Sequence, residues 1–162
     1  MDAVEYLIKQ HRELESLMEQ VAKASDVSKK KALFTQAADH LTVHITSEEQ
    51  IFYPAVKAKR TEDILLESLE EHLSLKRLLA DLLVMNTEEQ TFEPKFKVLK
   101  EQTEHHHEEE EEHLFPKVKK LLDEQQRNAL GEQMQALQLQ LKREGQPREA
   151  VKEQTEEAAP LI

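Results

Sequence analysis

The sequence contains no cysteine, and it has only two glycines and five prolines among 162 residues. The absence of cysteine excludes disulfide bonds, thiolate catalysis and metal clusters bound by cysteine. The scarcity of glycine and proline, together with abundant leucine, glutamate, lysine and glutamine, indicates long helices joined by short connections. No segment has the pattern of a strand. We therefore predict an all-α fold in one compact domain, long enough to bury a core.

A basic surface and long apolar runs are also lacking. The 22 basic and 33 acidic residues give a net charge of −11, which argues against nucleic acid and anionic lipid as partners because both need a basic surface. No run of about 18 apolar residues is present to span a membrane. Residues 1–5 have neither the basic start nor the apolar stretch of a signal peptide. We expect a cytoplasmic protein with no nucleic-acid and no membrane partner.

One short motif occurs twice, over residues 44–54 and 106–116. In each copy a histidine precedes a glutamate by four residues, a second glutamate follows at once, and an aromatic residue and a proline close the motif. A four-residue step on an α-helix returns side chains to the same face, so each copy can present an imidazole and a carboxylate to one point. The pairs are His44 with Glu48 and His106 with Glu110.

Apolar residues at intervals of three and four predict four helices, over about residues 2–24, 28–57, 62–85 and 92–122. The apolar stripes of the first and third helices each contain a histidine, which can be a metal ligand or a structural residue held by hydrogen bonds. A buried carboxylate without a partner costs several kcal/mol, so the motif glutamates need a cation or several donors. The predicted inward group is His11, His44, Glu48, His72, His106 and Glu110.

The register of the fourth helix needs a separate choice, because each of its three consecutive histidines has a glutamate four residues later. The apolar phase of residues 92–99 and the distance to Pro116 favour His106 with Glu110. We assign the other charged and histidine side chains of this region to a hydrated outer face: His105, His107, Glu108, Glu109, Glu111 and Glu112.

Several neighbouring residues have more than one interpretation. Lys76 lies on the inward stripe, where its ammonium would repel a metal ion; it can extend outward or donate to a carboxylate beside the ligands. Glu49 lies about 100° from the inward face, and we place it in solvent. We interpret His40 as half-exposed in preference to a ligand. Pro54 and Pro116 each remove a helix hydrogen bond and predict a kink or a helix end.

Four antiparallel helices with short turns form an up-and-down bundle, in which the second and fourth helices run the same way. Their His-Glu pairs would then meet across the bundle axis. Four imidazoles and two carboxylates are too many for one tetrahedral ion, but they suit two ions about 3.5–4 Å apart with the carboxylates bridging. Nitrogen and oxygen ligands without sulfur suit iron, zinc or manganese.

The residues after 122 predict two further parts. Asp123 is a good N-cap for an accessory amphipathic helix over residues 123–143, whose apolar stripe can pack on the bundle or pair with another chain. We favour packing on the bundle and expect a monomer, or a homodimer formed through this helix. Residues 144–162 are charged and predict a mobile acidic tail. The stripe consists of Leu130, Met134, Leu137 and Leu141.

The order and helix phase of His11, His72 and the two motif copies resemble the haemerythrin-like domains that carry the HHE cation-binding signature, over about residues 1–122. The resemblance implies a four-helix bundle around a non-haem di-iron centre that binds oxygen. It also implies that the two motif glutamates bridge the ions and that the four histidines are terminal ligands.

Two positions depart from the oxygen-carrying haemerythrins, which have a further histidine in place of Lys76 and an aspartate in place of Glu110. The resemblance is therefore to the branch with four histidines and two glutamates, which includes iron and oxygen sensors. We predict a binding or sensing module for oxygen or a related small molecule. The alternatives are a di-iron redox enzyme that removes peroxide or nitric oxide, iron-centre repair in the stress response, and an inert bundle whose histidines only form hydrogen bonds.

Overall fold

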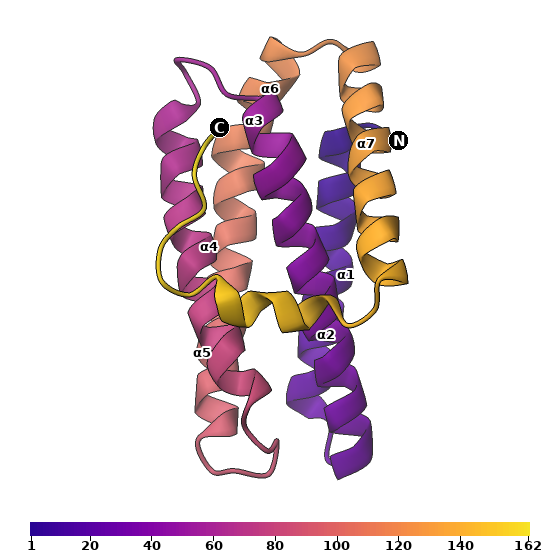
Figure 1. The fold of residues 1–162 in the computed structure, drawn as a ribbon, viewed down its shortest axis with the longest axis vertical. Helices are drawn as coiled ribbons and strands as arrows, with labels where there is room; N and C mark the ends of the chain where they lie inside the picture. Colours follow the sequence, from indigo (N-terminus) through magenta and orange to yellow (C-terminus); the bar gives the residue numbers. More distant parts are fainter.

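The computed structural model describes all 162 residues, and all of its regular secondary structure is helical. Four long helices pack side by side, and successive helices run in opposite directions in Figure 1. The all-α prediction is confirmed. The four helices are α1 (Ala3–Lys23), α2 (Val27–Ser47), α4 (Glu62–Leu83) and α5 (Phe92–Glu109).

Two of these helices continue through a π-helical segment that begins at a motif glutamate. Proline lacks an N–H and its ring crowds the carbonyl four residues earlier, and the wider π turn ahead of it accommodates both effects. The first of these rods ends at Ala55, soon after Pro54, which is one of the two outcomes predicted for the prolines. The second continues past Pro116 to Leu121, close to the predicted end of the fourth helix near residue 122. The segments are η1 (Glu48–Phe52) and α3 (Tyr53–Ala55) after α2, and η2 (Glu110–Leu114) and α6 (Phe115–Leu121) after α5.

The apolar core forms two clusters at different heights in the bundle. On α1, Leu7 belongs to one cluster and Leu14 to the other, and on α4 the same holds for Leu69 and Leu75. Apart from Leu73, the buried positions between them carry polar side chains. The bundle therefore has a polar layer at mid-height with apolar packing on both sides of it.

Helix α7 (Glu124–Arg143) begins at the predicted N-cap, where Asp123 and Gln126 form a capping box. It packs against α1 and α2 of the same chain. Its buried side differs from the predicted stripe, because Leu137 and Leu141 are only half-buried. The buried residues of α7 are Leu130, Gly131, Met134 and Gln138. A Cβ at Gly131 would lie 2.0 Å from the Met1 carbonyl oxygen, so this glycine allows the N-terminal residues to cross α7 closely.

The C-terminal segment differs from the mobile tail that we predicted. It crosses the bundle as the 3-10 helix η3 (Pro147–Glu153), drawn in yellow in Figure 1, and it contacts α2 and α4. Val151 is buried in an apolar cluster, and the Arg148 guanidinium pairs with the Asp39 carboxylate at 3.0 Å. Isolated apolar residues and single ion pairs give no periodic pattern, which is why the sequence did not indicate this docking. None of the helices combines the length and the apolar character of a membrane-spanning segment.

Candidate metal centre

The polar layer brings together all six residues that the sequence analysis selected. They come from four helices and two π segments, and each is between 0% and 2% exposed. The six are His11 on α1, His44 on α2, Glu48 in η1, His72 on α4, His106 on α5 and Glu110 in η2.

Each imidazole of this group turns its Nε2 atom toward a motif carboxylate. Nε2 of His11 lies 3.1 Å from Oε1 of Glu110, and Nε2 of His72 lies 3.1 Å from Oε1 of Glu48. The two motif histidines lie 3.5 Å from the glutamate of their own copy. Nitrogen and oxygen lone pairs from the first half of the bundle (α1, α2 and η1) and from the second half (α4, α5 and η2) therefore converge on one small volume.

Several buried atoms in this volume have no hydrogen-bond partner. They are Nε2 of His11 and of His44, Oε2 of Glu48 and Oε1 of Glu110. A buried polar atom without a partner costs about 1–3 kcal/mol, and native proteins contain few of them. Metal ions would satisfy all four atoms, so the residues fit a metal centre.

His107 also belongs to the centre, and its placement on a hydrated outer face was wrong. It is 1% exposed and stacks on His11 with 3.8 Å between ring centroids. His11, His44 and His107 can offer ligand atoms that lie within 4.8 Å of one another. The inward Thr103 could have indicated this, because positions three and four residues later share its face of the helix, so both His106 and His107 point inward.

The Nδ1 atom of every one of these five histidines contacts a side-chain oxygen. Such contacts hold the proton on Nδ1 and leave Nε2 free to bind an ion. The pairs are His11 with Glu111 at 2.7 Å, His44 with Gln10 at 2.9 Å, His72 with Glu49 at 2.9 Å, His106 with Glu71 at 2.7 Å and His107 with Glu15 at 2.8 Å.

Glu49 and Glu111 were predicted to lie in solvent, and this was wrong. Their side chains are only 8% and 20% exposed, and each holds a histidine from the other half of the bundle. Both are the second glutamate of a motif copy, so the doubled glutamate was the available signal. Helix phase alone missed it because a long side chain beside the inward face can reach a neighbouring helix.

Tyr53 and Lys76 complete the surroundings of His72. The Tyr53 hydroxyl donates to Oε2 of Glu110 at 2.6 Å and lies 3.3 Å from Nε2 of His72. Burial, reinforced by the neighbouring Glu110 and Glu48, raises the pKa of Tyr53 well above its ordinary value, so the phenol keeps its proton. Lys76, 3% exposed, donates to Glu49 at 2.8 Å, which is the second of the two interpretations offered for it.

The electrostatics of the centre disfavour a proton on His44, His72 and His107, whereas at His11 burial is outweighed by the Glu110 and Glu111 carboxylates, which raise its pKa. Burial, followed by the nearby His11, lowers the pKa of His107 to about 4 and that of His44 well below its ordinary value. Burial and the Glu110 carboxylate raise the pKa of Glu48 well above its ordinary value, so without an ion Glu48 holds a proton. A metal ion can replace this proton between the two carboxylates.

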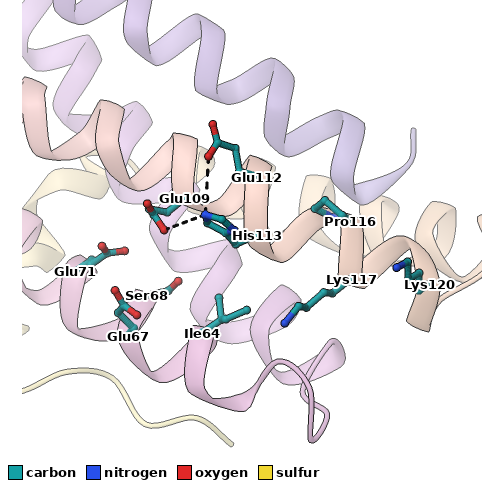
Figure 2. Close-up of a pocket in the computed structure, with 10 residues that line it drawn as sticks. All are labelled: Ile64, Glu67, Ser68, Glu71, Glu109, Glu112, His113, Pro116, Lys117 and Lys120. Carbon is teal, nitrogen blue, oxygen red and sulfur yellow. Dashed lines mark ion pairs between the residues drawn. The ribbon is translucent and has the colours of Figure 1, made fainter.

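An acidic groove of about 460 Å³ lies on the outer surface between α4 and the α5–η2–α6 rod, and none of the cluster residues lines it. Figure 2 shows His113 on its wall, paired with Glu109 and Glu112. Glu71 also lines the groove and holds Nδ1 of His106, so the groove adjoins the outer contacts of the centre. His105 and His113 are 64% and 58% exposed, and His40 is half-buried outside the cluster.

Comparisons with known proteins agree with this geometry. The profile of the haemerythrin HHE cation-binding domain matches residues 2–118. The crystal structure of a haemerythrin HHE cation-binding domain-containing protein from Mycobacterium kansasii is similar, with a TM-score of 0.79 and 25% sequence identity. The alignment covers 95% of this chain and 99% of that chain. No protein with a curated description matches the sequence.

Proposed function

The chain belongs to the haemerythrin HHE cation-binding domain family, and from this premise we propose that its buried cluster holds two iron ions bridged by Glu48 and Glu110. The main support is the set of unpartnered inward atoms on both glutamates and on two histidines. Two ions held by both carboxylates would lie about 3.5–4 Å apart. Zinc or manganese is compatible with the same nitrogen and oxygen donors.

The two ion positions have different ligands in this proposal. His11, His44 and His107 serve the first position, and His72 and His106 serve the second. Because the second position has one imidazole fewer, it leaves room for an outside ligand. The apolar clusters on both sides of the layer exclude bulk water from it.

We propose that this second position binds oxygen or a related small molecule, and that the protein serves as a binding or sensing module. Iron in such a centre supplies the reversible oxygen-binding and redox chemistry that nitrogen and oxygen donors support. The protein supplies a dry layer, fixed histidine tautomers and a phenol donor at Tyr53. The C-terminal segment docks close to Lys76, and both Lys76 and His72 contact Glu49. A change at His72 could therefore reach the surface through these contacts.

A second candidate function is removal of peroxide or nitric oxide, or iron-centre repair, and Tyr53 favours the peroxide reaction. A buried phenol beside the two-histidine position can hold a proton at the place where an O–O bond would be cleaved. In the binding function the same hydroxyl only donates a hydrogen bond. The two functions would therefore use the same metal ligands, and they would differ in whether the bound small molecule is converted.

Metal analysis and optical spectroscopy of the full chain test these functions. Protein purified from iron-rich cells should contain about two irons per chain. After anaerobic reduction, exposure to oxygen should give a stable visible absorption band that disappears on degassing, with no oxygen released from added peroxide. Rapid oxygen release from peroxide would favour the enzyme, and a metal-free chain of equal stability would remove both functions.

A further inference from the structure

A buried hydrogen-bond network joins α7 to the His44 side of the centre. Gln138 on α7 is 2% exposed and lies beyond the residues that match the family profile. Its Nε2 atom donates to Oε1 of Gln10 at 3.0 Å and to Oγ of Ser47 at 2.8 Å. Nε2 of Gln10 donates back to Oε1 of Gln138 at 2.5 Å. The two amides therefore form a reciprocal pair inside the protein.

This pair reaches His44 through its side chain and through its backbone. Nδ1 of His44 lies 2.9 Å from Oε1 of Gln10, and the Ser47 hydroxyl donates to the His44 carbonyl at 2.9 Å. Because that hydroxyl has a single hydrogen, it must accept from Gln138. Tyr6 donates to Oε1 of Gln138 at 2.7 Å and accepts from Gln10 at 3.1 Å. These bonds fix which end of each amide faces which neighbour.

The orientation of Gln10 matters because an amide has a donor end and an acceptor end. The corresponding residue in the other half is Glu71, whose carboxylate can accept from His106 with either oxygen. If Gln10 turned its amino group toward His44, Nδ1 would have to accept and the imidazole proton would move to Nε2. That atom lies 3.5 Å from Glu48 and must be free for an ion to bind.

We propose that Gln138 is a positioning residue of the metal centre: it holds the Gln10 carbonyl oxygen toward Nδ1 of His44 and so keeps Nε2 of His44 free. The inference rests on the proposed function, because it assigns His44 to an ion. This role makes α7 part of the site. Metal binding then depends on the ligands and also on Gln138, which lies outside the region that the family profile covers.

Titration of the metal-free full chain with Co²⁺ tests the assignment. Gln138→Leu should weaken the affinity at the His44 side about tenfold, as loss of an outer contact to a ligand does. Met134→Leu on the same buried face of α7 is the matched control and should bind Co²⁺ like the wild type. If circular dichroism shows that Gln138→Leu is unfolded, Gln138→Met replaces it with a side chain of nearly the original length.

A second variant separates positioning from packing. In a Gln10→Glu background either carboxylate oxygen can accept from His44. Gln138→Leu should then weaken the Co²⁺ affinity less than about twofold, which is the deviation expected between two independent substitutions. Wild-type affinity of Gln138→Leu, or the same loss in both backgrounds, would overturn the proposal.

The tautomer of His44 can be observed without any metal. Nuclear magnetic resonance of the ¹⁵N-labelled imidazoles should show the proton of His44 on Nδ1 in the wild type and partly on Nε2 in Gln138→Leu. An unchanged Nδ1 tautomer in the variant would refute the role of Gln138. A wild-type chain that binds no Co²⁺ would contradict the proposed function, and the tautomer would still decide the role of Gln138.

Discussion

The first half of the bundle, α1 with α2 and η1, and the second half, α4 with α5 and η2, place matching side chains around the centre. In both, the residue before the first histidine holds the motif histidine, and the glutamate after the motif glutamate holds a histidine of the other half. Other matched positions differ between the halves, and four such pairs matter here: Gln10 and Glu71, Glu15 and Lys76, Ile45 and His107, and Tyr53 and Phe115.

These differences make the two proposed ion positions inequivalent. Although His107 belongs to α5 of the second half, it stacks on His11 and adds a third imidazole to the first position. Tyr53 belongs to α3, which continues α2 and η1 of the first half, but it lies beside His72 of the second position. In the proposed function, the matched residues hold the two ions, and the mismatched residues give the two positions different chemistry.

The largest expected effect is the loss of a motif glutamate, because each one serves both positions. Glu48→Gln and Glu110→Gln should each lose both ions. They should also lower the stability of the iron-loaded protein by about 2.7 kcal/mol for each ion lost, if the ions are present at about 100 times their dissociation constant. Metal analysis and thermal unfolding measure the two effects. Glu108→Gln, at an exposed position, is the control, and equal losses in Glu110→Gln and Glu108→Gln would argue against the centre.

His107→Gln should affect only one of the two positions. We expect the three-histidine position to lose its ion, or to bind it at least about tenfold more weakly, while the two-histidine position keeps its own. His105→Gln removes an exposed neighbour and should change neither position. Metal content after gel filtration measures both variants, and two retained ions in His107→Gln would return His107 to a purely structural role.

Glu71→Gln makes the second half resemble the first. Binding at the two-histidine position should weaken about tenfold, because the new amide has no partner like Gln138 to orient it toward His106. Co²⁺ titration of this variant beside Glu70→Gln, an exposed neighbour, measures the change. Wild-type affinity would mean that an unoriented amide is sufficient at this position.

Tyr53→Phe makes the aromatic residues of the two motif copies alike and should have the smallest effect. The loss of one hydrogen bond to Glu110 should cost about 1 kcal/mol of stability and leave the number of ions unchanged. If Tyr53 only donates a hydrogen bond, the visible band formed with oxygen should shift without loss of reversibility. Phe115→Leu, which repacks the matched aromatic position, is the control. Loss of an ion from Tyr53→Phe would show that the phenol does more than position Glu110.

Helix periodicity predicted the all-α fold and the inward positions of His11, His72 and the motif pairs, because burial on a helix follows its 3.6-residue repeat. The phase of the apolar residues alone did not place His107 or Glu49. Both lie beside the centre of the inward face, where the reach of the side chain and the position of neighbouring helices decide the contacts. The same limit applies to Gln138, since a single buried amide leaves no pattern in the sequence and is identified only through its partners Gln10 and Ser47.

Crystals of the iron-loaded full chain, measured with X-rays at the iron absorption edge, would locate the ions. We expect two anomalous peaks about 3.5–4 Å apart, one beside His11, His44 and His107 and the other beside His72 and His106. A map with no peak between Glu48 and Glu110, or with a single peak elsewhere in the chain, would contradict the proposed centre.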